Sequence, residues 1–226
     1  MGGLEIMKKT ATIGIILVLL LTSVGAVSAN LVSNGGFESP TADVPFTSEM
    51  ASGLTGWTIE SGNIDLIGTL WTPHGPQQSI DLSGCERATI SQSIATVPDA
   101  LYKLSFAQAG NTYDAPSTKT VEVFWNGVSQ GTFAFNTAGF DTTTMGWKIV
   151  EIPNLKATAV STEIKFRDVT PVGPSPSQCV GVALDDVSVD PFTAPPIPEF
   201  PTIALPAALI IGLIGAVLFI QKSRDN

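Results

Sequence analysis

Hydrophobic and polar residues alternate along most of the central part of the chain. A period of two is typical of β-strands that bury one face. Asn126-Gly127 also predicts a tight hairpin, since both residues tolerate positive φ. Many short strands at this spacing predict an all-β fold, a sandwich or jelly roll. The predicted strands cover residues 63–67, 78–82, 88–94, 101–107, 120–125, 128–135, 147–152, 162–166 and 180–189.

The N-terminal segment breaks this alternation with one apolar run. Lys8 and Lys9 precede the run over 13–21, and small residues at 27–29 suit a signal peptidase. We therefore expect residues 1–29 to be a signal peptide and Asn30 to begin the mature chain. The alternative is an uncleaved N-terminal anchor.

A second apolar run covers residues 202–220 near the C-terminus. Its 19 residues would span about 28 Å as a helix, which matches a bilayer core of about 30 Å. Basic residues in the tail 221–226 favour a cytoplasmic C-terminus. The domain 30–192, joined to the span by a proline-rich linker over 193–201, is then expected on the extracellular face of the membrane.

The charge of the domain 30–192 is strongly acidic. It carries seventeen Asp and Glu against seven Lys and Arg, a net charge near −10. A protein without a basic patch is not expected to bind nucleic acid or anionic lipid. The balance fits a solvated outer surface and a domain that can hold a cation.

Cysteine usage agrees with an exported domain. Cys85 and Cys179 are the two cysteines of the chain, and an oxidising compartment favours their pairing. Closing so long a loop would add about 4–5 kcal/mol of stability in the chain-entropy description. The alternative is a pair of free, buried thiols.

Enzyme chemistry has no clear signature in this sequence. The chain has one histidine and lacks the usual hydrolase, phosphate-loop and zinc-protease motifs. A carboxylate pair for glycoside hydrolysis is the one catalytic option left open. We therefore expect a protein that is not an enzyme.

The aromatic residues divide into predicted core and predicted surface positions. Trp57 and Trp147 each follow a glycine at the start of a strand, and we assign both to the core. Trp125 ends a strand at the hairpin, so we expect it to be half exposed.

Two loops contain aromatic residues together with polar ones, and loops on a rigid scaffold often bind ligands. Sugars stack on exposed aromatic rings, whereas the alternative for any such ring is core packing. The predicted carbohydrate site therefore consists of Trp71, His74, Asn111, Tyr113 and Asp114.

The C-terminal segment resembles the PEF-CTERM sorting signal of archaeal surface proteins. The resemblance rests on a motif followed by an apolar span and a basic tail, and the motif is Pro198, Glu199, Phe200, Pro201 and Thr202. It implies that an archaeosortase-like enzyme cuts near the motif and transfers the protein to an anchor. The alternative is an ordinary membrane anchor that is never cut.

The domain itself resembles the choice-of-anchor C domain, which is related to plant cell-wall domains of unknown function. The resemblance rests on strings in a fixed order, namely 30–38, 56–59, 61–68, 79–84, 90–94, 145–147 and 183–189. It implies a galactose-binding-like β-jelly roll whose first and last strands are adjacent, and a distant relation to carbohydrate-binding modules.

The same resemblance implies a structural Ca²⁺ held by Glu38, Asp185 and Asp186. Carboxylate and carbonyl oxygens are the ligands that calcium prefers. Side chains alternate along a strand, so only one of the two aspartates is expected to point into a given site. The alternative is three hydrogen-bonded carboxylates without an ion.

These observations predict an exported, surface-anchored module without catalytic activity. It would bind carbohydrate of the cell envelope or extracellular matrix. The alternative is a structural or adhesive envelope protein that contacts other proteins and has no sugar site. An anchored hydrolase is the third candidate.

Overall fold

The computed structural model describes residues 30–115, 117–171 and 179–192. The predicted signal peptide, linker, membrane span and tail lie outside these residues. Within the described ranges, no helix is long and apolar enough to cross a membrane. All the regular elements described are β-strands.

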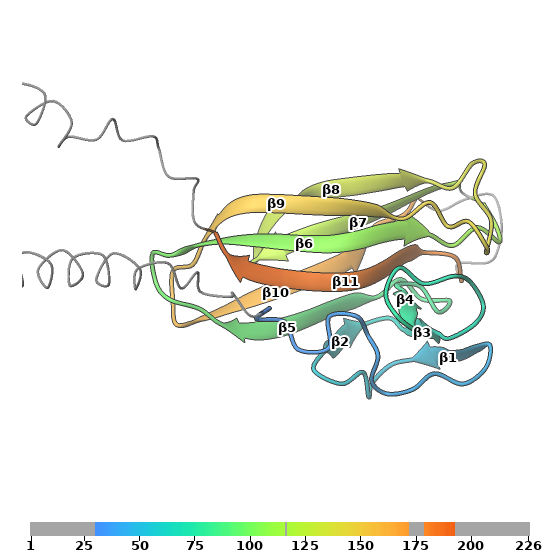
Figure 1. The fold of residues 1–226 in the computed structure, drawn as a ribbon, viewed down its shortest axis with the longest axis horizontal. Coiled ribbons are helices and arrows are strands. Elements are labelled where there is room, and N and C mark those ends of the chain that lie inside the picture. Colours follow the sequence, from blue (N-terminus) through green and yellow to red (C-terminus); the bar gives the residue numbers. More distant parts are fainter. Residues whose placement is uncertain (1–29, 116, 172–178, 193–226) are drawn as a thin grey trace, which may run out of the picture. The chain divides into compact units, whose positions relative to one another are not determined.

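The strands form two antiparallel sheets packed face to face as a jelly-roll sandwich (Figure 1). The six-stranded sheet has the order β1 (Phe46–Met50), β3 (Ile64–Ile67), β4 (Ser79–Asp81), β11 (Val182–Pro191), β6 (Leu101–Gly110) and β9 (Lys148–Lys156). The five-stranded sheet has the order β2 (Thr58–Ser61), β5 (Thr89–Ala95), β10 (Ser161–Asp168), β7 (Thr118–Trp125) and β8 (Val128–Asn136).

The all-β prediction is confirmed, and each predicted strand overlaps an observed one. The hairpin prediction also holds, since Asn126 and Gly127 have φ of 50° and 76° between β7 and β8. The sequence pattern did not predict strand β1. Its sequence, Phe-Thr-Ser-Glu-Met, lacks strict alternation, and it is an edge strand that pairs with β3.

The main core fills the space between the two sheets with aromatic and branched side chains. Phe37, Trp57, Phe106 and Phe166 form a chain of ring contacts, with centroids 5.2–6.0 Å apart. Edge-on and tilted ring pairs of this kind add to the burial energy of the rings themselves. All four side chains belong to the main buried cluster.

The first described residues run beside the last strand, as the family resemblance implied. Leu31 N donates to Val189 O at 3.0 Å, and Val187 N donates to Gly35 O at 2.9 Å. A Cβ atom on Gly35 would lie 2.0 Å from Val187 O. Only glycine can therefore bring this segment so close to β11.

The residues of β11 that point into the core change from even-numbered to odd-numbered positions part-way along the strand. Val182 and Leu184 lie in the core, and after them Val187 and Val189 do. The pairing of β11 with β6 shifts register between Asp185 and Ser188, and Asp186 has φ of 46°. Such a bulge inserts one extra residue and reverses the alternation beyond it.

Two of the three tryptophan predictions need revision. Trp57 is core, as predicted, whereas Trp125 is only 4% exposed rather than half exposed. Trp125 belongs to the inward-facing side of β7, and its ring lies against Tyr102 with centroids 5.8 Å apart. Trp147 is half-buried rather than fully core, and its indole N–H donates to Thr72 O at 3.0 Å.

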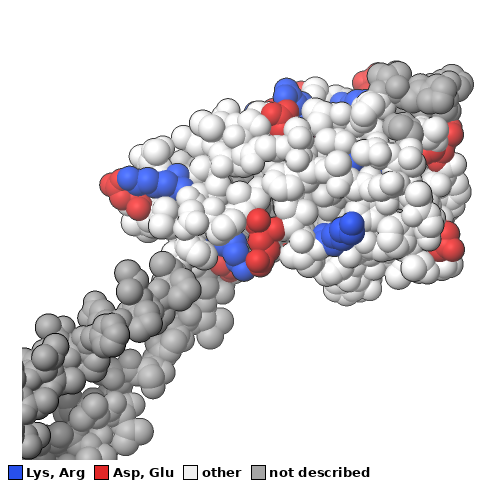
Figure 2. All heavy atoms as spheres, turned by 90° about the horizontal axis from the view of Figure 1, so that it is seen from above, with Lys and Arg blue, Asp and Glu red and all other residues white. Residues whose placement is uncertain are grey.

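Charged side chains lie in small mixed groups on the face shown in Figure 2. Exposed ion pairs among the described residues include Lys103–Glu151 at 2.6 Å and Lys156–Asp99 at 2.8 Å. Exposed pairs of this kind contribute little to stability. Basic and acidic atoms alternate on this face, with broad uncharged areas between them.

Candidate functional site

A cavity of about 520 Å³ lies at the end of the sandwich where β6 ends and β11 begins. Residues from β1 and β3 form one side of it, and the loop that follows β6 forms another. Its lining consists of Phe46, Ser48, Glu49, Asp65, Leu70, Gly84, Cys85, Asn111, Tyr113, Asp114, Cys179 and Val180. This size is within the usual range for small-molecule sites.

The predicted disulfide between Cys85 and Cys179 is present and forms part of the cavity wall. It joins the loop after β4 to the residues that lead into β11. The two cysteines are 94 residues apart in sequence, so the bond closes a long loop. It therefore fixes one side of the cavity covalently while restricting the unfolded chain.

Asp65 lies in the cavity lining and was not predicted as a site residue. It is 8% exposed, and its Oδ1 accepts a hydrogen bond from Glu49 N at 2.8 Å. Burial raises the pKa of the Asp65 carboxyl, and the Glu49 N–H opposes that shift. Sequence alternation places a polar residue between Ile64 and Leu66 on an outer face, but it does not show that β1 pairs beside β3 and brings Glu49 N to that residue.

Two residues of the cavity hold unusual backbone conformations. Glu49 has φ of 52° and Cys85 has φ of 104°. Residues other than glycine rarely adopt positive φ, and such conformations concentrate at functional sites. At Glu49 the conformation coincides with a register shift in the β1–β3 pairing, and it presents the N–H group to Asp65.

Three of the five predicted carbohydrate-site residues do line this cavity. Tyr113 is 60% exposed, so its ring is accessible. Asn111 is buried, and its amide donates to Asp81 Oδ2 at 2.8 Å while its Oδ1 accepts from Tyr113 N at 2.9 Å. Asn111 therefore positions the loop, whereas Tyr113 and the exposed Asp114 face outward.

The other two predicted residues lie elsewhere. Trp71 is 3% exposed and packs in a second apolar cluster with Ile67, Phe135 and Met145, so the prediction of an exposed ring is wrong. Its indole N–H donates to Ser79 Oγ at 2.8 Å. A loop that carries turn residues can still fold inward when it covers a sheet face, and the sequence gives no sign of this.

His74 lies beside the two aspartates of β11 instead of beside Tyr113. Its Nδ1 is 2.6 Å from Asp186 Oδ2, and its backbone N–H donates to Asp185 Oδ2 at 2.9 Å. Its ring contacts Trp147, with centroids 6.1 Å apart. The loop that contains Trp71 and His74 therefore lies next to the part of β11 that was predicted to bind calcium.

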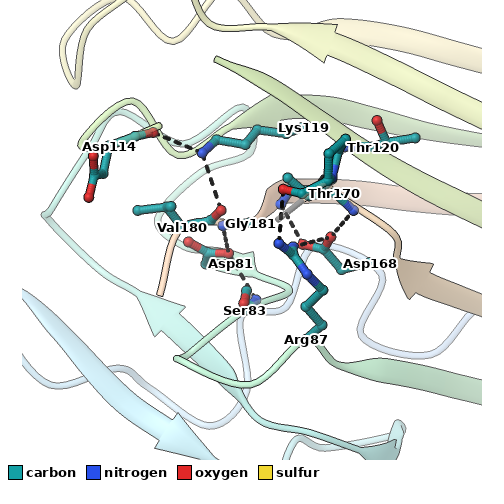
Figure 3. A network of polar contacts seen from close by, with 12 residues as sticks. Asp81, Ser83, Arg87, Asp114, Lys119, Thr120, Asp168, Thr170, Val180 and Gly181 are labelled. Carbon is teal, nitrogen blue, oxygen red and sulfur yellow. Dashed lines mark hydrogen bonds and ion pairs between the residues drawn. The ribbon is translucent and has the colours of Figure 1, made fainter. Parts of the chain in front are cut away.

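A network of buried charges contacts the cavity-lining residues Asp114 and Val180 (Figure 3). Asp81 accepts from Ser83 N at 2.9 Å and from Gly181 N at 3.0 Å. Asp168 accepts from Arg87 Nη1 at 3.1 Å and from Val182 N at 3.0 Å. These bonds hold the start of β11 against both sheets.

Lys119 completes this network from β7. Its Nζ donates to Asp114 O at 3.0 Å and to Val180 O at 3.2 Å, and the residue is fully buried. Burial lowers the pKa of the Lys119 ammonium, and nearby Asp81 opposes that shift. Burial also raises the pKa of Asp81 well above its usual range, while the amide of Asn111 lowers it and Asp168 raises it further.

Glu38, Asp185 and Asp186 come together as the resemblance implied. A Cβ on Gly36 would lie 3.4 Å from Asp186 Oδ1, 3.7 Å from Glu38 Cγ and 3.9 Å from Asp185 Oδ1. The expectation that only one aspartate can face the site is wrong. The bulge at Asp185 and Asp186 turns both carboxylates toward the same loop, where Gly75 lies near each.

Backbone N–H groups donate to two of these carboxylates, Asp185 and Glu38. Asp185 Oδ2 accepts from Gly75 N at 2.7 Å as well as from His74 N, and Glu38 Oε1 accepts from Gln77 N at 3.0 Å. Among the described residues, no group of three or more His, Cys, Asp or Glu side chains is arranged to hold a metal. Calcium binding therefore stays a prediction.

Comparison with known families identifies the domain. Residues 30–190 match the model described as "Protein of unknown function (DUF642)". The chain belongs to the DUF642 family. This match covers well over half of the chain and agrees with the resemblance to cell-wall domains of unknown function drawn from the ordered strings.

Residues 197–215 match the PEF-CTERM archaeal protein sorting domain, which confirms the sorting signal read from the sequence. One curated relative is halomucin of Haloquadratum walsbyi, 34% identical over 109 residues. That alignment covers 43% of this chain and 1% of halomucin, so the chain spans about 1% of its relative's length. The sorting-domain match points to a surface protein anchored at its C-terminus.

Solved structures similar to this DUF642 domain include several carbohydrate-binding modules. TmCBM61 in complex with β-1,4-galactotriose is 16% identical, with a TM-score of 0.47 over 73% of this chain and 100% of that one. The module CBM36 in complex with calcium and xylotriose is 16% identical, with a TM-score of 0.41 over 59% of this chain and 92% of that one. At these scores the comparison carries no conclusion about ligands.

We predict that Asp185 makes the stability of the DUF642 domain depend on pH. Burial, assisted by nearby Asp186 and opposed by backbone N–H groups, raises the pKa of Asp185 to about 6. Between the ordinary aspartate pKa and about 6, the native state holds a proton that the unfolded chain has released. The free energy of unfolding should therefore fall as pH rises through this window, by at most about 3 kcal/mol.

Urea unfolding between pH 4 and 7, with a chelator present, measures this slope. Asp185→Asn should reduce the slope. Titration of the Asp185 carboxyl carbon by NMR gives the pKa directly, even if the variant fails to fold. A carboxyl that titrates near 4 would contradict the prediction.

We also predict that calcium raises the melting temperature of the protein. Glu38 Oε2 and Asp186 Oδ1 have no hydrogen-bond partner among the described residues, so two carboxylate oxygens near Gly36 are available to a hard cation. Free calcium at about 100 times its Kd would add about 2.7 kcal/mol. Calorimetry with calcium and with chelator measures the effect.

Glu38→Ala should abolish this calcium dependence, whereas Glu163→Ala, which removes a carboxylate from β10, should preserve it. Equal melting temperatures with calcium and with chelator would show that the three carboxylates form their hydrogen bonds without holding calcium.

Proposed function

We propose that this protein is a surface-anchored, non-catalytic module that binds carbohydrate of the cell envelope or extracellular matrix. The exposed ring of Tyr113 at the cavity is the observation that carries the proposal. An exposed aromatic ring offers an apolar face on which a sugar ring can stack.

The shape and composition of the cavity support the same proposal. Phe46 and Leu70 provide apolar surface, while Ser48, Glu49 and Asp65 provide hydrogen-bonding groups. Carbohydrates present both apolar faces and hydroxyl groups, so a site of this mixed kind suits them. The disulfide and the buried charges behind the cavity keep its wall rigid, which lowers the entropic cost of binding.

The alternative is a structural or adhesive role in which the exposed Tyr113 contacts another protein. Tyrosine is also enriched in protein interfaces. The two functions differ in what they bind, so a direct binding measurement separates them.

We predict that Tyr113→Ala weakens glycan binding about five- to tenfold, because an aromatic contact contributes about 1–1.5 kcal/mol. Stability should change by less than about 0.5 kcal/mol, since the side chain is largely exposed. Full-length protein in detergent, applied to an array of envelope and matrix glycans, gives the measurement.

Tyr113→Phe keeps the ring and should retain most of the binding. Val128→Ala removes an exposed apolar side chain at the β7–β8 hairpin and should have no effect. If no glycan binds the intact protein, the adhesive function replaces the carbohydrate-binding one.

We further propose that an archaeosortase-like enzyme removes the C-terminal segment. The match to the sorting domain over residues 197–215 supports this proposal. The intact mass of the protein extracted from its native membrane should then lack residues 203–220. Detection of peptides from that segment in the mature protein would instead favour a permanent membrane anchor.

A further inference from the structure

A second hollow, of about 430 Å³, adjoins the cavity that contains Tyr113. It is formed by the loop from β3 to β4 and the loop from β8 to β9, which both lie at the end of the sandwich where β6 ends (Figure 1). Leu70 belongs to the lining of both hollows. The two hollows therefore meet at this half-buried side chain.

The second hollow combines neutral polar groups with apolar rings. Thr69, Gln77 and Thr143 are exposed residues that bring hydroxyl and amide groups to it, and Pro73 and Pro76 bring apolar surface. Hydroxyls and amides both donate and accept hydrogen bonds, as the hydroxyl groups of sugars do. None of the described residues that line this hollow is charged. Its chemistry therefore suits a neutral sugar.

Hydrogen bonds between the two loops hold the second hollow in shape. Thr72 N donates to Thr142 O at 2.9 Å, and Thr72 Oγ1 donates to Thr143 O at 3.3 Å. The indole N–H of Trp147 donates to Thr72 O at 3.0 Å, and Asp141 Oδ1 accepts from Thr143 N at 2.9 Å. A site that is already formed loses less conformational entropy when a ligand binds.

We infer that the two hollows together bind a linear chain of neutral sugar units. This inference rests on the proposed carbohydrate function and names the substrate class. One sugar ring stacks on Tyr113 in the first cavity, the chain crosses Leu70, and further units bond to Thr69 and Gln77 in the second hollow. Each hollow has the size of a small-ligand site, so a chain that fills both carries about four rings.

The affinity should therefore depend on the length of the chain. A disaccharide reaches the first cavity alone, whereas a tetrasaccharide also reaches the second hollow. The added hydrogen bonds, at their ordinary net strength, correspond to about tenfold tighter binding of the tetramer. A hexamer should bind about as tightly as the tetramer, since its extra units lie beyond both hollows.

Calorimetric titration of the full-length protein, in a detergent without a sugar head group, measures these affinities. The probes are β-1,4-linked glucose, mannose and galactose oligomers of two, four and six units. At least one of the three series should bind with the expected dependence on length. Tyr113→Ala should lower the affinity of the dimer and of the tetramer by the same factor, because both occupy the first cavity.

The double variant Thr69→Ala, Gln77→Ala tests the second hollow directly. Both side chains are exposed, and the printed backbone bonds of these residues, from Thr69 N to Pro45 O and from Gln77 N to Glu38 Oε1, remain possible in the variant. The tetramer should then bind about as weakly as the dimer binds the unmodified protein.

The matched control is the double variant Thr132→Ala, Gln130→Ala, which removes the same two kinds of side chain from β8. Neither residue lines either hollow, so the tenfold advantage of the tetramer should persist. The length series on the unmodified protein tests the inference even if a variant fails to fold.

The outcomes separate this inference from the function on which it rests. Equal affinities for dimer and tetramer overturn the two-hollow inference and leave carbohydrate binding standing. An unchanged advantage of the tetramer in the folded Thr69→Ala, Gln77→Ala protein also overturns it. If none of the three series binds but another glycan on the array does, the neutral chain is the wrong ligand. Failure of every glycan to bind overturns the proposed function itself.

Discussion

The hydrogen bonds that fix the start of β11 are the constraint on which the rest of this structure depends. Asp168 reaches from the five-stranded sheet to Val182 N, and Lys119 reaches from the same sheet to Val180 O. A Cβ on Gly181 would lie 2.3 Å from Asp168 Oδ2 and 2.6 Å from Asp81 Oδ1. Buried charges are costly unless they are fully paired, so this small set of bonds tolerates little change.

The same anchor creates the candidate site. With β11 held in place, Cys179 lies where it can bond to Cys85, and Asn111 can bridge Asp81 and the Tyr113 loop. The cavity wall is thus built from groups that stability already requires. Only the outward-facing side chains of that wall, Tyr113 and Asp114 among them, are left to set what binds there.

A single inserted residue in β11 brings together the polar side chains near Gly36 and Gly75. Strict alternation would place Asp185 and Asp186 on opposite faces, whereas the bulge turns both toward Gly36 and Gly75. It also returns Val187 and Val189 to the core. A local backbone irregularity therefore keeps the core continuous while it gathers Glu38, His74 and both aspartates at one place.

The sequence by itself determined the all-β class, the positions of most strands along the chain, the hairpin at Asn126-Gly127, the pairing of the two cysteines and the C-terminal sorting signal. Each depends on local periodicity, turn chemistry or a contiguous motif, except the cysteine pairing, which follows from there being two cysteines in an exported domain. Only the tertiary structure decided that Trp71 and Trp125 are buried, that His74 joins the aspartates, and that Asp65 lines a cavity together with residues of β1. Burial of a loop and the aim of a carboxylate depend on which distant strand covers them, and alternation along one strand carries no information about that neighbour.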